Sequence, residues 1–389
     1  MQAAWLKSSA LSGTLGLGMM LAGCAGMSTP PTPVGPGCVA SQGVYAYVLN
    51  SSPTSGTVSM FAMNDCTGGL TALNPATVAT GANPKMVVVT PNGQFVYVVN
   101  AGDNTVSMYS AADTGVLTPL TPPTVPTGNL PQGLAVDSLG RFVYAANSND
   151  NTVSMYTINP GTGMLTPTTP PTFAAGSGPD FVTLTESAGP LVEGGSGFAY
   201  VSNQNDDTVS MYSVNQTTGV LRPLTPATVA TGPSPVGVTL DPGGYAYVPN
   251  EGGNTISVYS INTDGTLTST GTVTTGNQPT SVAVPSSRFA YVVNRLDDAV
   301  STYTINDSTG NLTPNGTGTV PTNAQPFPII LGPYSNFAFV VNESGSVSIY
   351  SLNSDGTLTN VGTAATGNGS VWIAVTAVPH AVPADQKDP

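Results

Sequence analysis

The sequence has few titratable side chains and a single histidine. Of its 389 residues, 7 are lysine or arginine, 20 are aspartate or glutamate, and charged residues make up only 7%. Nucleic acid is excluded as a partner, because there is no basic stripe to neutralise phosphates. The histidine, His380, follows the last repeat in "PHAVPADQKDP". A histidine general base is therefore not expected.

Long helical patterns and the common catalytic motifs are also missing. Gly (45) and Pro (35) are spread along the chain, and no long stretch keeps a period of 3.6 residues, which excludes a helical solenoid. There is no P-loop, no G-x-S-x-G elbow, no haem motif and no cluster of two histidines for a metal. We therefore expect no cofactor and no metal site.

What the sequence does contain is one repeated segment. "FVYVVNAGDNTVSMYS" starts at residue 95, and close copies start at residues 142, 198 and 245. Each copy has two runs of β-branched and aromatic residues around a break of Asn, Asp and Gly, which is typical of a hairpin. The first run closes on an asparagine, and this asparagine marks seven repeats at intervals of 44 to 56 residues: Asn50, Asn100, Asn147, Asn203, Asn250, Asn294 and Asn342.

Each repeat contains two further strands. An apolar strand that follows a turn ending in Pro precedes the hairpin, as in "TGANPKMVVVTPNG", and a Pro-containing strand follows it, as in "TGVLTPL". Proline cannot donate to a ladder, so the last strand is expected at the outer edge. This period predicts an all-β, seven-bladed β-propeller with four antiparallel strands per blade. A lone strand at residues 371–375 would pair with residues 45–49 in the first blade and close the ring.

The first residues predict export. Residues 1–23 contain Lys7, an apolar stretch and small residues, as in a signal peptide. "LAGC" resembles a lipobox, which implies acylation of Cys24; the alternative is a plain secretory signal with an incidental cysteine. Residues 24–37 would form a Pro-rich tether, residues 38–378 the propeller and residues 379–389 a tail. We expect a monomer in the cell envelope, anchored by lipid to the outer membrane, with an envelope protein or glycan as partner.

Two cysteines remain, Cys38 and Cys66. In the four-strand scheme they fall at the same end of the first blade, and an exported protein meets an oxidising compartment. We therefore predict a disulfide between them, which would stabilise the blade that contains both ends of the propeller chain.

Eight acidic residues are predicted to share one face of the ring. They fall in the loops between the second and third strands: Asp103, Asp150, Asp206, Asp207, Glu251, Asp297, Asp298 and Glu343. One interpretation is that they are turn residues on a solvated rim. The other is a weak cation site or a docking face for a basic partner.

The repeated residues identify a family resemblance. "YVVN", "YVSN", "YVPN" and "YVLN", each followed by text like "TVSMY", are similar to the YVTN repeats of bacterial surface propellers. With the strand "P-x-x-V-x-V-x-P-x-G" they also resemble the seven-bladed lactonase family, which includes a 6-phosphogluconolactonase and muconate-lactonising enzymes. The latter use His, Glu and Arg at the mouth of the channel, and none of these residues can be transferred to a position in this chain.

The residues that begin the innermost strands are expected to line the mouth of the central channel. Among them we single out Lys85, Gln132, Asp180 and Trp372 as candidate ligand contacts, with Lys85 and Asp180 as the only charged pair. The alternative is a solvated channel lip. The arginines do not begin innermost strands: Arg141 and Arg288 lie in turns of the opposite face, Arg222 in an outer strand and Arg295 in an acidic-face loop.

Two functions follow from these features. Because charged groups are scarce at the expected mouth, we favour a lipid-anchored binding or assembly module that acts through its loop faces and has no catalytic residues. The alternative is a lactonase that hydrolyses a sugar lactone, as the family resemblance implies.

Overall fold

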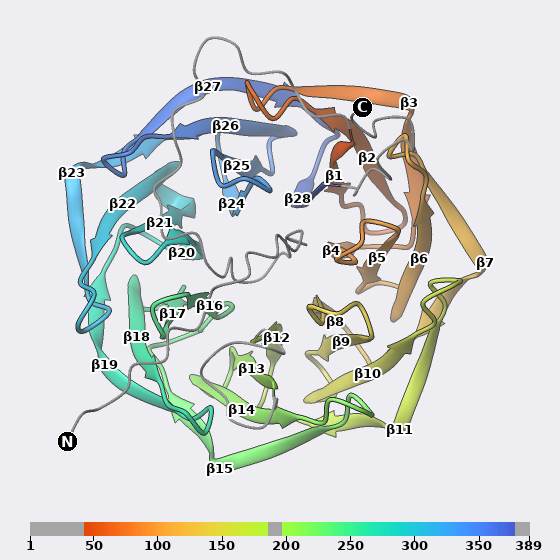
Figure 1. Ribbon diagram of the computed structural model, residues 1–389, viewed down its shortest axis with the longest axis horizontal. Helices are drawn as coiled ribbons and strands as arrows, with labels where there is room; N and C mark the ends of the chain where they lie inside the picture. The colour runs from red at the N-terminus through yellow and green to blue at the C-terminus, as the bar shows by residue number, and fades with distance from the viewer. Residues whose placement is uncertain (1–42, 186–196, 378–389) are drawn as a thin grey trace, which may run out of the picture.

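The chain folds into a ring of seven blades (Figure 1). The computed structural model describes residues 43–185 and 197–377. Within them the chain forms seven antiparallel four-stranded sheets. The predicted fold class is thus confirmed. Cys24, Cys38, His380, the signal peptide, the tether and the tail lie outside the described residues, so the predictions for these segments stay predictions.

The strands occupy four concentric positions. The innermost strands are β4 (Pro84–Val89), β8 (Pro131–Val136), β12 (Pro179–Leu184), β16 (Thr239–Asp241), β20 (Pro279–Ser286), β24 (Pro326–Leu331) and β28 (Ser370–Ala377). The second strands are β1 (Val44–Asn50), β5 (Phe95–Asn100), β9 (Phe142–Asn147), β13 (Gly197–Asn203), β17 (Tyr245–Asn250), β21 (Phe289–Asn294) and β25 (Phe337–Asn342). The third strands are β2 (Gly56–Met63), β6 (Thr105–Ala111), β10 (Thr152–Ile158), β14 (Thr208–Val214), β18 (Thr255–Ile261), β22 (Ala299–Ile305) and β26 (Ser346–Leu352). The outer strands are β3 (Leu70–Thr80), β7 (Leu117–Pro126), β11 (Leu165–Ala174), β15 (Leu221–Ala230), β19 (Leu267–Thr274), β23 (Leu312–Pro321) and β27 (Leu358–Ala365).

The first blade joins the two ends of the described chain. Its sheet has the order β28-β1-β2-β3, so the last strand in the sequence is its innermost strand. Leu49 lies opposite Trp372, and Tyr45 lies opposite Thr376. The predicted closure of the ring is confirmed, with a register one residue away from the expected pairing. Blades are numbered from this one, so β4–β7 form blade 2 and β24–β27 form blade 7.

Prolines lie on the exposed outer strands, as predicted. Pro75, Pro122, Pro170 and Pro226 are all exposed in strands that pair on one side only. A missing N–H is tolerated there, and it also blocks pairing with a foreign strand. The second strands show the opposite pattern, and β5 is buried along its whole length.

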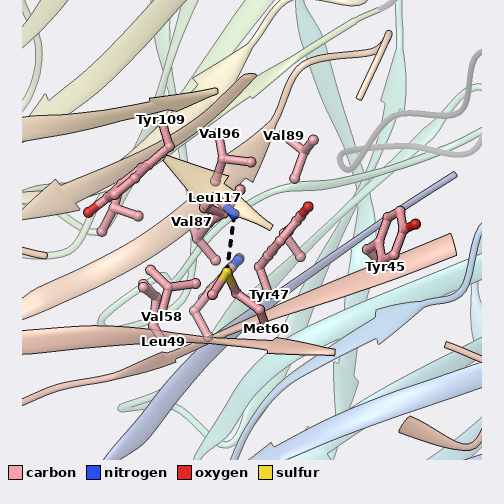
Figure 2. Close-up of a cluster of buried hydrophobic side chains, with 13 residues drawn as sticks. Tyr45, Tyr47, Leu49, Val58, Met60, Val87, Val89, Val96, Tyr109 and Leu117 are labelled. Atoms are coloured by element: carbon pink, nitrogen blue, oxygen red, sulfur yellow. Dashed lines mark hydrogen bonds between the residues drawn. The ribbon is translucent and has the colours of Figure 1, made fainter. Parts of the chain in front are cut away.

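The hydrophobic core lies between the blades. One buried cluster joins Tyr47, Leu49 and Met60 of blade 1 to Val96 and Leu117 of blade 2 (Figure 2). In the same interface the Leu117 N–H points at the Met60 sulfur, 3.2 Å away. The other six clusters of buried side chains likewise join neighbouring blades. The repeated apolar residues therefore form the interfaces between blades, and each blade stabilises the next one along the ring.

Tyrosine hydroxyls at two positions of the repeat bind neighbouring blades to each other, except where Phe61 and Phe339 replace them. The Tyr97 hydroxyl of blade 2 donates to the Gly163 carbonyl oxygen of blade 3 at 2.7 Å. In the opposite direction, the Tyr109 hydroxyl donates to the Ala79 carbonyl oxygen of blade 1 at 2.7 Å.

The turn that accepts the Tyr97 hydroxyl contains a glycine. Gly163 has a φ of +71°, and a Cβ at this position would overlap the Phe95 ring. The turn therefore requires glycine both for its backbone conformation and for this close packing.

The strand-closing asparagines hold the loops on one face. Asn100 is fully buried; its amide nitrogen donates to Thr105 and Ser107, and its amide oxygen accepts from the Gly81 backbone N–H at 3.1 Å. Gly81 belongs to the turn that leads into the innermost strand β4. The asparagine thus fixes the turn from which the channel-lining residues begin.

Candidate functional site

The innermost strands begin with a bulge at one end of the ring. Pro84 pairs with Asn100, the register shifts, and pairing resumes at Met86 opposite Val99. Comparable shifts follow Pro131, Pro179, Pro279 and Pro326. A bulge frees residues from the ladder and changes the direction of their side chains. We call this end of the channel the channel mouth, formed by the residues after these prolines and those after the strand-closing asparagines.

Asp180 is the most perturbed acid at the channel mouth. It follows Pro179 in blade 4 and is half-buried. Burial raises the pKa of Asp180 to about 7; the nearby Glu251 carboxylate raises it further, and the Lys85 ammonium opposes both. A carboxyl group with such a pKa exchanges protons near neutral pH, as a general base requires.

Lys85 and Asp180 come from blades 2 and 4, and the ring brings them within electrostatic reach. Innermost strands converge on the axis, so residues two blades apart in the sequence still interact across the mouth. The two residues of the predicted pair therefore interact across the ring, and their role in binding a ligand stays a prediction. Gln132 begins β8, between these two strands, and its side chain is half-buried.

A second set of polar residues lies in the loops of the same face, and Glu251 of this set acts on Asp180. The Gln278 amide donates to a Glu251 carboxylate oxygen at 2.7 Å, and the Gln204 amide donates to the other oxygen at 3.3 Å. Arg295 and Glu343 form an ion pair at 2.6 Å between blades 6 and 7. Gln204, Glu251, Arg295 and Glu343 each directly follow a strand-closing asparagine. Because equivalent positions on adjacent blades touch, this position lies close to the axis.

Aromatic rings lie beside the charged pair. Phe181, next to Asp180, packs on Trp372 of blade 1 with ring centroids 5.3 Å apart. Phe327 of blade 7 approaches the same indole edge-to-face at 6.0 Å. These rings form an apolar aromatic cluster in the blades that also carry the starts of β12, β24 and β28, and such a cluster can contact the apolar part of a small substrate. Trp372 was predicted at the mouth, whereas the two phenylalanines were not singled out.

Six of the eight predicted acidic-face residues hold loops in place. The Asp103 carboxylate accepts from the Ala82 backbone N–H at 2.7 Å, and Asp150 accepts from the Asn129 backbone N–H at 2.7 Å. Asp206, Asp207, Asp297 and Asp298 bind backbone N–H groups in the same way. These contacts support the interpretation as turn residues. Glu251 and Glu343 differ, because they contact side chains of neighbouring blades at the channel mouth.

The remaining predicted residues lie elsewhere. Arg141 is on the opposite face, where it pairs with Asp137 at 2.9 Å. Cys66 is in the turn after β2 and is disulfide-bonded, but the predicted partner Cys38 is outside the described residues. The described residues hold no group of three His, Cys, Asp or Glu side chains with the geometry of a metal site. Nor does the described part of the chain include a helix that is long and apolar enough to span a membrane.

The arrangement combines a base, a cation and an apolar surface. Asp180 can take a proton from water, and Lys85 can stabilise negative charge that develops on a carbonyl oxygen. The aromatic rings can hold the substrate beside both groups.

A family model described as "Lactonase, 7-bladed beta-propeller" matches residues 34–182 and 225–325, well over half of the chain. The chain belongs to this lactonase family. The match spans the strands that provide Lys85, Gln132 and Asp180, whereas Glu343 and Trp372 lie outside it. A comparison with curated proteins gave no match.

Solved structures share the fold of this lactonase-family chain. A putative 6-phosphogluconolactonase from Bacteroides uniformis is 20% identical with a TM-score of 0.73, covering 86% of this chain and all of its own. The putative 6-phosphogluconolactonase of Bacteroides fragilis is 20% identical with a TM-score of 0.70, covering 86% of this chain and 98% of its own. The periplasmic gluconolactonase of Pseudomonas aeruginosa is 18% identical with a TM-score of 0.68, covering 86% of this chain and all of its own.

Family membership corrects the function that the sequence favoured. We expected a non-catalytic binding or assembly module because charged groups are scarce at the starts of the innermost strands. The family match favours the lactonase alternative instead. The error has a physical origin: counting charges at those starts alone omitted the residues after the strand-closing asparagines. Glu251, Arg295 and Glu343 extend the polar site from this second position.

Sequence reasoning missed Gln204, Gln278 and Arg295 as residues of the site. The sequence nevertheless contains a pattern that could have identified these positions. The position after the closing asparagine reads Ser51, Ala101, Ser148, Gln204, Glu251, Arg295 and Glu343 through the seven blades. It changes from small to long polar residues at blade 4, whereas the surrounding repeat barely changes. When one position of a repeat varies while the packing residues around it recur, the packing of the blades does not determine the residue at that position. Such a position is a candidate for a functional role.

Proposed function

We propose that this chain is a lactone hydrolase whose reaction takes place at the channel mouth. The observation that carries the proposal is the Asp180 carboxyl group, with a pKa of about 7, between Lys85 and Glu251 in a propeller of the lactonase family. The names of the Bacteroides and Pseudomonas neighbours support a lactone as substrate.

In the proposed reaction, Asp180 takes one proton from a water molecule while the water oxygen attacks the lactone carbonyl carbon. The carbonyl oxygen gains negative charge, which the Lys85 ammonium stabilises. The bond between the carbonyl carbon and the ring oxygen then breaks, and the ring oxygen receives the proton from Asp180. One lactone and one water give one hydroxy acid, and Asp180 returns to its ionised form.

The charges at the channel mouth favour a neutral lactone over a phosphorylated one. Among the described residues named at the mouth, the acids Asp180, Glu251 and Glu343 outnumber the bases Lys85 and Arg295, and Arg295 is already paired with Glu343. An incoming phosphate would meet a net negative site, and like charges within a few ångström repel each other strongly. We therefore expect glucono-δ-lactone to be hydrolysed in preference to 6-phosphogluconolactone if both are offered.

The test is hydrolysis of a lactone panel by the wild type and by the Asp180→Asn and Lys85→Ala variants. We expect kcat/KM of the wild type to rise with pH through a midpoint near 7, as the base ionises. The Asp180→Asn variant should lose on the order of 10²- to 10⁴-fold in kcat and lose this pH dependence. Asp113→Asn, which removes an exposed carboxylate outside the mouth, is the matched control. Wild-type activity in the Asp180→Asn variant would refute the assignment.

The location of the enzyme belongs to the same proposal. We propose that it acts in the cell envelope, held there by lipid on Cys24. The export signal at residues 1–23 supports this, as does the periplasmic location in the name of the Pseudomonas neighbour. Expression of the full chain and of a Cys24→Ser variant, followed by membrane fractionation, tests it. The wild type should sediment with membranes and the variant should not.

A further inference from the structure

An apolar cavity lies inside the ring, below the channel mouth. Its volume is about 170 Å³, and Phe181 and Trp372 form part of its wall. Most of its other side chains are aliphatic and come from the innermost strands of several blades, among them Met86, Leu134, Leu240, Val282, Ile330 and Leu331. The proposed reaction at Asp180 does not use this cavity. The apolar lining of the cavity therefore requires a separate explanation.

Polar groups in the wall are mostly bound to the protein itself. The Thr183 hydroxyl donates to the Val238 carbonyl oxygen at 2.7 Å, and the Thr239 hydroxyl donates to the Val282 carbonyl oxygen at 2.9 Å. Within the described residues, the Thr280 hydroxyl is buried without a hydrogen-bond partner. Thr280 directly follows Pro279, at the mouth end of β20. Thr280 thus offers one hydroxyl at the mouth, whereas the Thr183 and Thr239 hydroxyls of the wall are already bound to backbone carbonyl oxygens.

Blade 5 shapes this wall differently from its neighbours. Its second strand reads "YVPN", and Pro249 has no N–H to give to the innermost strand. Besides the bridge between Pro235 and Asn250, the Val236 N–H donates to the Pro249 carbonyl oxygen at 2.9 Å, and the ladder then resumes only at Thr239 opposite Tyr247. Gly237, with a φ of +79°, lies in this unpaired stretch, and its N–H donates to the Ser202 hydroxyl at 3.0 Å. The irregular strand remains tied to blade 4, and it lines the cavity without adding charge.

These walls suit hydrocarbon and reject hydrated groups. A sugar hydroxyl or a charge that entered the cavity would lose its water without gaining hydrogen bonds, which is costly. Burial of a methylene group is favourable on the same transfer, by about 0.8 kcal/mol, which corresponds to about a fourfold increase in affinity for each one. An apolar cavity of about 150 Å³ is known to stay dry and to bind benzene, so this cavity has room for about six to eight carbons.

We propose that the cavity binds an aliphatic chain that the substrate carries on its lactone ring. The ring stays at the channel mouth beside Asp180, within reach of the Thr280 hydroxyl and the Phe181 and Trp372 rings, and the chain extends between the innermost strands. The substrate class is then an alkyl- or acyl-substituted lactone. This inference rests on the proposed lactonase function and adds to it the part of the substrate that does not react.

Kinetics on lactones of increasing chain length test the proposal. With γ-butyrolactone, γ-octalactone, γ-decalactone and γ-tetradecalactone as substrates, kcat/KM should rise about fourfold for each added methylene of the side chain. It should level off once the chain reaches about six to eight carbons, when the cavity is full. The Ile330→Trp variant fills the cavity, so the ratio of the rates for γ-decalactone and γ-butyrolactone should fall towards one. Val361→Trp, the same kind of insertion on the exposed rim, should keep the wild-type ratio.

Binding of an unreactive probe separates this proposal from the proposed function. In calorimetry, 1-octanol should bind the wild type at least tenfold more tightly than 1-butanol, and Ile330→Trp should abolish this difference. A milder variant, Ile330→Phe, with near-UV circular dichroism as a check on folding, guards against a misfolded Trp variant. Lactone hydrolysis without any dependence on chain length, together with equal binding of both alcohols, would overturn the apolar subsite and leave the lactonase standing. Selective 1-octanol binding without hydrolysis of any lactone would support the subsite and overturn the lactonase.

Discussion

The Arg295 guanidinium donates a 2.6 Å hydrogen bond to the Glu343 carboxylate, from blade 6 to blade 7. Both side chains are 29% exposed, so the pair is partly shielded from solvent. The glutamate thereby occupies the arginine at the channel mouth that could otherwise bind an anion. This pairing leads to the first of five predictions.

Glu343→Gln should make the site more receptive to phosphate. The variant frees the Arg295 guanidinium, which is suited to bidentate phosphate binding. We expect 6-phosphogluconate to bind about three- to tenfold more tightly than to the wild type in calorimetry, with a stronger salt dependence. Asp113→Asn removes one negative charge away from the mouth and serves as the control. Equal effects in both variants would show that only net charge matters.

Asp180→Asn should stabilise the protein at alkaline pH. The folded pKa of about 7 lies above the ordinary value of 3.8, so ionisation of Asp180 destabilises the folded state as the pH rises from about 4 to about 7. The variant avoids this cost and should be more stable at pH 8 by about 1–3 kcal/mol, a range that allows for the remaining solvent contact. The advantage should vanish near pH 4. Urea unfolding at the two pH values measures both quantities.

Asp150→Asn should change the stability at alkaline pH in the opposite direction, by destabilising the protein. Hydrogen bonds from the Asn129 backbone and side chain lower the pKa of Asp150, so its ionised form stabilises the fold above its ordinary pKa. This variant should lose stability at pH 8, and the loss should disappear as the pH falls through the folded pKa. A stability change of the same sign for both aspartates at pH 8 would contradict the assignment of Asp180 as the strained group.

Asn100→Ala should destabilise the fold more than Asn342→Ala does. The Asn100 amide oxygen accepts from the Gly81 N–H, and its amide nitrogen donates to the Thr105 and Ser107 hydroxyls. Within the described residues, the Asn342 amide oxygen has no partner although it is buried. We expect a loss of about 2–4 kcal/mol for Asn100→Ala and about half of that for Asn342→Ala. Unfolding in urea compares the two, and the reverse order would refute this role for the asparagine oxygen.

Tyr97→Phe should weaken the contact between blades 2 and 3 by about 1 kcal/mol. The variant keeps the ring in the core and removes only the hydroxyl that donates to the Gly163 carbonyl oxygen. Blade 7 already has Phe339 at the equivalent position, so the packing itself tolerates this ring. Tyr334→Phe, at an exposed tyrosine, is the matched control and should leave the unfolding midpoint unchanged. A Tyr97→Phe variant as stable as the control would mean that water replaces the lost donor.

The sequence was a good guide to the fold because the repeat encodes local geometry and packing together. The spacing of the asparagines, the Gly turns and the prolines of the outer strands fixed the number of blades and the order of strands, and the structure confirms them. For the site, Lys85, Gln132, Asp180 and Trp372 were predicted from their place at the start of innermost strands. The same reasoning failed for Arg295, because its loop was assigned only to the acidic face.

By itself, the sequence determined that seven similar units bury their tyrosines and valines against one another, because these residues recur with the period of a blade. Only the tertiary structure decided which polar residues meet. Lys85 and Asp180 are two blades apart, and their interaction depends on how closely the innermost strands approach the axis. The pKa of Asp180 is likewise a property of its surroundings, since burial and the charge of Glu251 act through space and leave no trace in the local sequence.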